Sequence, residues 1–392
     1  EPGRPPAGAR TGWVRPLVAR FLGSGGARPA EGGGRAPPMI TRSNGGIMSA
    51  AQGRTSCVSM LLSGTASGVM GAAFLARQAG VAQALTLDIG GTSADVALII
   101  DGAPQFGTGE MIGEFPLHVP SVSVTSIGDG GGSIAWVDGF GMLKVGPESA
   151  GSSPGPACYG RGGDRPTLTD CNLLLGRLNP DYFLGGRMPL DVERAREVAA
   201  SLAARLDMDP MTLAHGVVRV ANANMERAIR VVSVQRGFDT RDFALVAFGG
   251  AGGMHACEIA DTLELGTVIV PRHAGVLSAL GMLLADVTKD YSQSVLRPAA
   301  EVDTAWLAGR FAALEAQAAA DLAAEGFEGA RARLERALDL RYVGQSYEIT
   351  VPWPGDFRAE FDRRHLQLYG YANPGRAAEI VTLRVKAVGL TA

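Results

Sequence analysis

The residues of this chain that are suited to chemistry gather at glycine-rich turns between apolar runs. In "LTLDIGGTSADVALII", residues 85–100, one predicted strand brings Asp88 to a turn and a second strand leaves it. The turn consists of Gly90, Gly91, Thr92 and Ser93. Glycines let backbone N–H groups approach anionic oxygens, hydroxyls add donors, and an acid at a strand end suits a hydrated divalent cation. The pattern fits a phosphate-binding hairpin, and it fits equally a plain hairpin with Asp88 capping the turn.

A second glycine turn follows a predicted strand in "LVAFGGAGGMHACEIA". Its residues are Gly249, Gly250, Ala251 and Gly252. At the start of a predicted helix, bare backbone of this kind receives a ligand or serves close packing of the strand against the helix. His255 and Cys257 are two positions apart and therefore point to different faces of that helix. We expect His255 near a cleft and Cys257 in the core, where free thiols are common.

Two further stretches are candidates for contact with a ligand. "SIGDGGGSIAWVD" carries Gly130, Gly131 and Gly132. Consecutive glycines cost folding entropy, so they indicate close approach by a ligand or by another backbone, unless they form a flexible hairpin tip. Arg161 lies in the polar stretch "PGPACYGRGGDRPTLTD", where it either clamps an anion or remains solvated.

The segments that must position these residues show strand and helix patterns in alternation. Apolar periodicity predicts helices over 68–79, 190–206, 211–235 and 305–324, with Asp191 as the N-cap of the second. The stretch 243–271 is typical of a strand, helix and strand unit with glycines at its first turn. No GxxxxGK[ST] motif occurs, and a strand rather than a helix follows the first glycine turn, which excludes P-loop and Rossmann sites. The pattern predicts an α/β fold.

Composition excludes several classes of protein. The 392 residues carry 36 Lys and Arg against 39 Asp and Glu, scattered along the chain, so we expect no nucleic-acid partner. Four cysteines without CxxC spacing argue against a zinc knuckle and a disulfide scaffold, and favour a reducing cytoplasm. The apolar stretch 60–76 is short and rich in small residues, so we expect a packed helix and no membrane span. Residues 1–38, dense in Pro, Gly and Arg, are predicted to be disordered or not genuine.

Several long blocks, in order along the chain, resemble the hydantoinase A/5-oxoprolinase family of ATP-dependent amidohydrolases. They include "SNGGIMSA", "LLSGTASGVMGAA", "LDIGGTSADVALI", "SIGDGGGSIAWVD" and "VQRGFDTRDFALVAFGGAGGMHACEIA". The resemblance implies an actin-like, RNase H-like α/β fold, with an ATPase domain over 39–295 and a C-terminal α/β domain over 296–392. The family opens with another D-x-G-G-T-x-T-D loop, and no such loop precedes Met39 here, so we expect a fold incomplete at its N-terminus.

This resemblance also implies an activity and its cofactors. Family members cleave ATP as they activate a cyclic amide of the 5-oxoproline or hydantoin type for ring opening. With ATP and Mg²⁺ as cofactors, Asp88 would be catalytic and would order the metal through water. Residues Gly90 to Ser93 would hold phosphate, and Gly249 to Gly252 would face the adenosine. Substrate contacts would come from Gly130, Gly131, Gly132, Arg161 and His255.

The resemblance also implies partner proteins and leaves two alternative functions open. The family commonly works with a B-type subunit, and a homo-oligomer is also compatible with the chain. One alternative is the beta-type subunit of an ATP-dependent carboxylase; the other is a catalytically inactive nucleotide-binding subunit. Three positions depart from the family pattern: Thr65 and Gly253 stand in place of proline, and Asp129 in place of a small residue.

Overall fold

The computed structural model describes residues 14–23, 38–107, 110–112, 115–117, 119 and 121–391. The chain forms two compact units. We call Leu62–Leu283 the continuous unit, and the described residues up to Leu61 together with those from Leu284 the discontinuous unit. This division differs from the expected boundary at residue 295, because the strand over Ile47–Ser49 pairs with a strand that begins at Val287. Each unit is described by itself.

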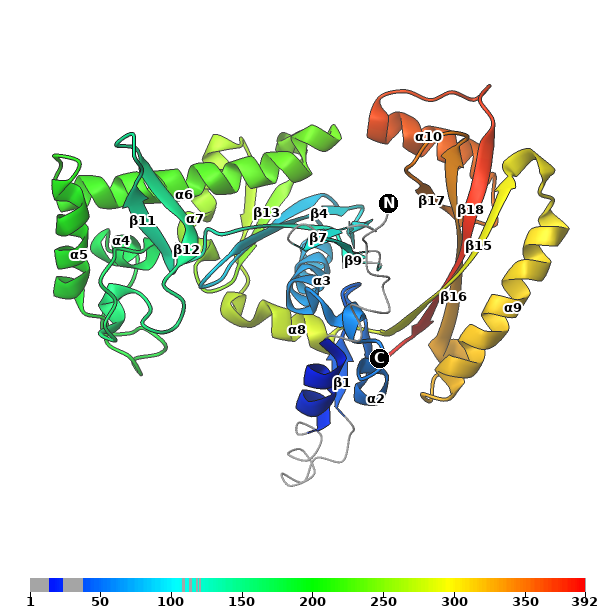
Figure 1. Cartoon of the computed structure of the whole chain (residues 1–392), viewed down its shortest axis with the longest axis horizontal. Helices are drawn as coiled ribbons and strands as arrows, with labels where there is room; N and C mark the ends of the chain where they lie inside the picture. The colour runs from blue at the N-terminus through cyan, green and yellow to red at the C-terminus, as the bar shows by residue number, and fades with distance from the viewer. Residues whose placement is uncertain are drawn as a thin grey trace. The chain divides into compact units, whose positions relative to one another are not determined.

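A mixed sheet forms the centre of the continuous unit (Figure 1). Its strand order is β10-β4-β3-β13-β14, and β5 pairs with β4. Strands β10, β4 and β3 are antiparallel neighbours, whereas β3, β13 and β14 run parallel. The bounds are β3 Ala84–Ile89, β4 Ala94–Ile100, β5 Ala103–Pro104, β10 Val124–Ile127, β13 Ala244–Phe248 and β14 Thr267–Ile269. The hairpin expected over 85–100 is confirmed as β3 and β4.

Side chains of these strands alternate between two hydrophobic cores. Leu85, Leu87 and Ile89 of β3 pack with residues of α6 (Pro210–Val232) and α7 (Gly252–Thr262), on what we call the α6 face. Val246 and Phe248 of β13 pack with α3 (Ser63–Gln78) and α8 (Leu277–Leu283), on the α3 face. Because side chains alternate along a strand, the side of β3 opposite Leu85, Leu87 and Ile89 carries Asp88.

Helix α3 is the packed, small-residue helix expected from the sequence. Five of its side chains lie in the core of the α3 face: Ala66, Val69, Ala72, Ala73 and Ala76. A Cβ at Gly71 would lie 3.0 Å from the carbonyl oxygen of Leu277, so glycine permits the close approach of α8. In the part of the chain that the structure describes, no helix combines the length and apolar character that crossing a bilayer requires.

The continuous unit has further elements outside this sheet. They include β11 Ser133–Val137, β12 Leu143–Ser149, α4 Leu168–Leu174, α5 Val192–Ala204 and the short strands β6 Phe106–Gly107, β7 Glu110–Ile112, β8 Phe115–Leu117 and β9 Ser121–Val122. Asp191 caps α5 by accepting from Arg194 N, as expected, and Asp209 caps α6. Thr167 and Asp170 form a capping box at the start of α4.

The discontinuous unit is a second α/β layer, with strand order β1-β2-β15-β18-β16-β17. The bounds are β1 Met39–Thr41, β2 Ile47–Ser49, β15 Val287–Pro298, β16 Ala332–Tyr342, β17 Ile349–Trp353 and β18 Ala378–Gly389, with helices α2 Ala50–Gly53, α9 Thr304–Ala323 and α10 Phe357–Tyr369. Ile47 pairs with Val287, and Asn44 Nδ2 donates to Asp290 Oδ2 at 2.8 Å across 246 residues of sequence. Phe311 of α9 stacks on Trp353 of β17 at 4.9 Å between ring centroids.

The segment 1–38 differs from its prediction where it is described. Residues 14–23 form a helix in which Leu22 is buried at 4% exposure. Its apolar residues, Val14, Leu17, Val18, Phe21 and Leu22, recur at helical spacing, a signal that the Pro and Gly around them obscured. The remaining residues of the prediction, apart from Pro38, lie outside those described.

Candidate functional site

Two carboxylates face the same side of the β3 and β4 hairpin. Asp88 and Asp95 are directly opposite each other in the antiparallel register. Burial raises the pKa of Asp88 to about 6, and the negative charge of Asp95 adds to the shift. Burial also raises the pKa of Asp95, although hydrogen bonds from Ser126, Ser93 and Thr65 oppose that shift. The pair therefore forms a half-buried acidic site that favours a bound proton or cation.

The turn between these strands keeps backbone donors available. Gly90 N donates to Ser93 O at 3.0 Å and closes the turn. The N–H groups of Gly91 and Thr92 donate to no acceptor in the described chain, and both residues are exposed. Successive free N–H groups in a turn form a concave site that binds anions. This geometry is compatible with the phosphate-binding alternative for the hairpin.

The three consecutive glycines pack against this turn. Gly131 N donates to Gly90 O at 2.9 Å, and Gly132 N donates to Gly91 O at 2.6 Å. A Cβ at Gly130 would overlap the backbone of Thr92, so only glycine permits the contact. The close partner of these glycines in the structure is thus another backbone, one of the two possibilities that the sequence left open. Gly131 and Gly132 bind the carbonyl oxygens of the turn through their own N–H groups. The expected contact of the three glycines with substrate stays a prediction.

The second glycine turn lies beside the first. Strand β13 runs parallel to β3, with Phe248 in register with Asp88. Gly249 has a φ of +78°, and a Cβ there would overlap Asp88 Oδ1 and Ile89 O. Ala251 N donates to Ile89 O at 3.0 Å, which ties the two turns together. Both turns therefore follow the carboxyl ends of neighbouring parallel strands, which is where α/β sheets bind their ligands.

The start of α7 adds further backbone donors to this edge of the sheet. Ala251 is the N-cap residue and provides no side-chain cap. A Cβ at Gly250 would meet nothing within 4 Å, so open space lies next to this backbone. Uncapped N–H groups and the positive end of the helix dipole favour a negatively charged ligand. The edge as a whole combines donors for an anion with two acids for a cation.

His255 and Cys257 exchange the places expected for them. His255 is fully buried, with Nδ1 2.7 Å from Asn222 Oδ1 and Nε2 3.2 Å from Asn172 Nδ2. Burial lowers its pKa to about 4, with a smaller contribution from the charge of Arg177, so the ring is neutral at pH 7. Cys257 is exposed. The expectation was wrong because α7 buries the stripe formed by His255, Ala256, Ile259 and Ala260, which turns position 257 outward.

Among the described residues, no hydrogen bond joins Arg161 to either turn. Its side chain is exposed, and its Nη2 lies 3.8 Å from Met188 Sδ. A solvated arginine was one of the two readings of the sequence, and this contact agrees with it. Its role toward substrate stays a prediction.

The acidic pair fits one kind of metal ion. In the described part of the chain, no cluster of three or more His, Cys, Asp or Glu side chains could hold a metal. Mg²⁺ keeps several of its waters and is typically held by one or two carboxylates together with substrate phosphates. Asp88 and Asp95 beside the free donors of the turn suit this mode of binding. Asp95 was missed in the sequence, although a short hairpin loop places it opposite Asp88.

Comparison with known proteins places the chain in a family. A model of the hydantoinase/oxoprolinase family matches residues 10–291. Caprolactamase subunit alpha of Pseudomonas jessenii is 34% identical over 389 residues, which cover 96% of this chain and 56% of that protein. 5-Oxoprolinase 1 of Arabidopsis thaliana is 33% identical over 404 residues, which cover 97% of this chain and 32% of the plant protein.

A solved structure gives the same result. The crystal structure of the ATP-dependent caprolactamase from Pseudomonas jessenii matches with a TM-score of 0.84 and 34% identity, over 97% of this chain and 57% of that chain. The chain thus spans between a third and somewhat more than half of the length of these relatives. The chain belongs to the hydantoinase/oxoprolinase family, and the expected α/β fold is confirmed.

Proposed function

We propose that this chain is the ATP-binding part of an enzyme that hydrolyses a cyclic amide. The observation that carries the proposal is the meeting of two glycine turns at the ends of β3 and β13, with Asp88 between them and Asp95 opposite. Membership of the hydantoinase/oxoprolinase family supports it, as do relatives named caprolactamase and 5-oxoprolinase. The substrate is a lactam or cyclic imide.

The proposed reaction uses ATP because an amide is a poor electrophile. The amide oxygen attacks the γ-phosphorus of ATP and ADP leaves, which converts the carbonyl oxygen into part of a good leaving group. One water then attacks the carbon and the ring nitrogen departs with a proton, leaving an acyl phosphate. A second water releases phosphate. One ATP, two waters and one cyclic amide become ADP, phosphate and the ring-opened acid, which is an amino acid when the substrate is a lactam.

The residues of the chain have distinct roles in this proposal. The free N–H groups of Gly91 and Thr92 bind phosphate oxygens, and Ser93 adds a hydroxyl. The open backbone at Gly250 and the start of α7 face the nucleoside. Asp88, assisted by Asp95, holds Mg²⁺ through water, and the ion neutralises phosphate charge during transfer. Such catalysis depends chiefly on positioning and on electrostatic stabilisation.

The proposal includes a partner and a compartment. A relative named caprolactamase subunit alpha supports assembly with a second, B-type subunit, which would complete the active enzyme. All four cysteines are free thiols, three of them buried, which supports a reducing compartment such as the cytoplasm.

Calorimetric titration of the chain with ATP tests the nucleotide site. ATP binding should require Mg²⁺ and disappear in EDTA. Asp88→Asn should weaken Mg·ATP binding at least about tenfold, because the charge that holds the ion is lost. Asp101→Asn is the matched control: Asp101 is an exposed acid just beyond the other end of β4, and asparagine tolerates its φ of +52°. Binding without Mg²⁺, or equal loss in both variants, contradicts the proposal.

Turnover tests the reaction class. The chain is co-expressed with a B-type subunit, and phosphate release is measured with 5-oxoproline, hydantoin or caprolactam. Release with one of these and formation of the ring-opened acid is the expected result. Release that instead requires a ketone and bicarbonate identifies the carboxylase alternative. Mg·ATP binding without turnover on any substrate identifies a nucleotide-binding subunit.

A further inference from the structure

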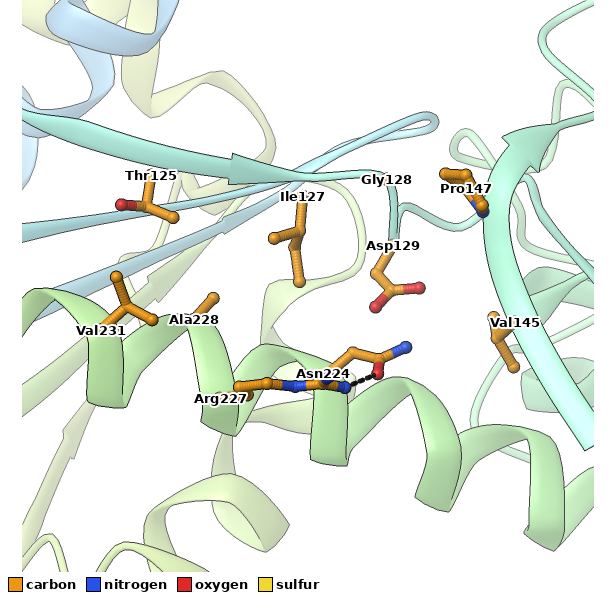
Figure 2. A pocket seen from close by; sticks show the side chains of 10 residues that line it. All are labelled: Thr125, Ile127, Gly128, Asp129, Val145, Pro147, Asn224, Arg227, Ala228 and Val231. Carbon is orange, nitrogen blue, oxygen red and sulfur yellow. Dashed lines mark hydrogen bonds between the residues drawn. The ribbon is translucent and has the colours of Figure 1, made fainter. Parts of the chain in front are cut away.

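A cavity lies on the α6 face of the sheet, away from the acidic pair. It has a volume of about 350 Å³ and lies between the end of β10, strand β12 and helix α6 (Figure 2). Ile127, Val145 and Val231 contribute apolar walls, and Asp129, Asn224 and Arg227 contribute polar groups. A cavity of this size, mostly apolar with a few convergent polar groups, is typical of sites for small molecules.

Asp129 is a buried acid without its full set of partners. It is only 3% exposed, and its Oδ1 accepts no hydrogen bond within the described chain. Asn224 faces this carboxyl across the cavity as a hydrogen-bonding neighbour, and Arg227 contributes an opposite charge (Figure 2). Burial nevertheless raises the pKa of this carboxyl to about 6. A buried acceptor left unsatisfied is costly, so its presence in the wall of a cavity points to a donor supplied by a ligand.

Arg227 provides the opposite charge on the other side of the cavity. Its Nη2 donates to Asn224 Oδ1 at 2.5 Å, which holds the guanidinium against α6. No other hydrogen bond of this guanidinium is made within the described chain, and the side chain is exposed. The planar fork of arginine is suited to binding a carboxylate through two hydrogen bonds. The cavity thus offers an acceptor and a bidentate donor, with Asn224 between them (Figure 2).

The alternation of β10 separates this cavity from the proposed nucleotide site. Thr125 and Ile127 line the cavity, whereas Ser126, between them, bonds to Asp95 of the acidic pair. Neighbouring side chains of a strand point to opposite faces, so the two sites lie on opposite faces of one sheet. Asp129 directly precedes Gly130, which packs on the hairpin turn. The cavity is therefore a separate site joined to the turn by one short backbone segment.

We propose that the Asp129 cavity binds a small carboxylic acid that also carries an N–H donor. The carboxylate pairs with Arg227, the N–H group donates to Asp129 Oδ1, and a short carbon chain lies along Ile127 and Val145. Two kinds of molecule have this chemistry: an amino acid, through its ammonium group, and a lactam acid, through its ring N–H. Asp129 repels a molecule with two carboxylates and no nitrogen. A lactam without a carboxylate leaves Arg227 unpaired.

Calorimetric titration of the 392-residue chain, without ATP or Mg²⁺, tests this site. The probes are L-glutamate and 5-oxoproline, with glutarate as the acid that lacks nitrogen and 2-pyrrolidinone as the lactam that lacks a carboxylate. At least one of the first two should bind at least about tenfold more tightly than both of the others. Tighter binding of L-glutamate assigns the site to amino acids, and tighter binding of 5-oxoproline assigns it to lactam acids.

Three variants locate the binding. Arg227→Met and Asp129→Asn should each weaken it about tenfold to hundredfold, because each removes one charge-assisted hydrogen bond. Arg219→Met is the matched control, since Arg219 is an exposed arginine of the same helix outside the cavity. Absence of binding by all four probes, or unchanged affinity in the first two variants, overturns the proposal. Asp88→Asn should retain this binding while losing Mg·ATP, which separates failure here from failure of the nucleotide site.

Discussion

Two buried carboxylates, one in each compact unit, have different partners. In the discontinuous unit, Asp339 is 1% exposed and accepts from Arg384 Nε and Thr350 Oγ1, each at 2.6 Å. In the continuous unit, Asp129 is 3% exposed and one of its oxygens has no partner in the described chain. Asp88 and Asp95 likewise form no ion pair with a lysine or arginine among the described residues.

The presence or absence of an arginine partner distinguishes carboxylates that stabilise the fold from carboxylates that are candidates for binding a ligand. A buried carboxylate that meets an arginine keeps its charge at little net cost, and removing either partner destabilises the fold. A buried carboxylate without such a partner binds protons more readily, and groups of that kind gather at functional sites. By this criterion both candidate sites lie in the continuous unit, where acids without such a partner reduce the stability of the free protein.

The largest expected effect concerns the backbone that approaches Asp88. Gly249→Ala should lower the free energy of unfolding of the continuous unit by about 4 kcal/mol, because the new Cβ overlaps Asp88 Oδ1 and the left-handed φ strains alanine. Gly250→Ala, with open space around its Cβ, should cost less than about 1 kcal/mol. Hydrogen exchange of peptides from the continuous unit measures both values. Equal effects at the two positions would show that the turns do not pack as described.

Asp339→Asn tests the paired acid. The variant leaves Arg384 without its counter-charge, and we expect a loss of about 3 kcal/mol in the free energy of unfolding of the discontinuous unit at pH 7. Hydrogen exchange of peptides from β16 and β18 reports this loss. A neutral or stabilising result would remove the distinction between the two units.

Asp129→Asn should act in the opposite direction, and only at high pH. The folded-state pKa of about 6 lies above the ordinary 3.8, so the native protein has its full stability below pH 3.8 and loses stability as pH rises through 6. Asparagine undergoes no such loss. The variant should therefore match the wild type at pH 4 and exceed it by at most about 3 kcal/mol at pH 8. Urea unfolding at both pH values measures the difference, and a variant less stable at pH 8 contradicts the assignment.

The smallest effect concerns an acid that is paired but exposed. Glu148 makes a bidentate ion pair with Arg165 at 2.6 and 2.8 Å in the continuous unit, and both side chains are more than half exposed. Exposed ion pairs contribute little because water screens them. Glu148→Gln should leave the urea midpoint unchanged within error. A measurable loss would mean that pairing matters without burial.

Local pattern was enough to predict the first hairpin and a helix start. The alternation around Asp88 predicted the hairpin, and Asp191 predicted the start of α5. Which face of a helix is buried was harder to predict. On α7 the buried stripe includes His255, and Cys257 is exposed. A histidine that is hydrogen-bonded to two asparagines can lie in a core. A helical pattern carries no information on which polar partners its buried face will meet.

Features formed by contacts between segments far apart in the sequence could not be predicted from local pattern. The Asp129 cavity forms only when the end of β10 meets α6, so neither segment alone suggests it. The three glycines beside Asp129 indicated a close approach, and only the structure shows that the hairpin turn is what approaches. The strands β1 and β2 were expected in the same domain as the hairpin of β3 and β4, yet β2 pairs with β15, and a parallel pairing of this kind has no local signal.

The hydrogen bond between Asn44 and Asp290 spans 246 residues, so it can form only long after Asn44 has been synthesised. A ribosome that adds about 5–20 residues per second needs roughly 10–50 s to make the stretch between them. During that interval the hairpin of β1 and β2 has emerged without β15, its neighbour in the sheet. The edge of β2 that pairs with β15 therefore stays unpaired, and open to chaperones or to aggregation, while the whole continuous unit is synthesised.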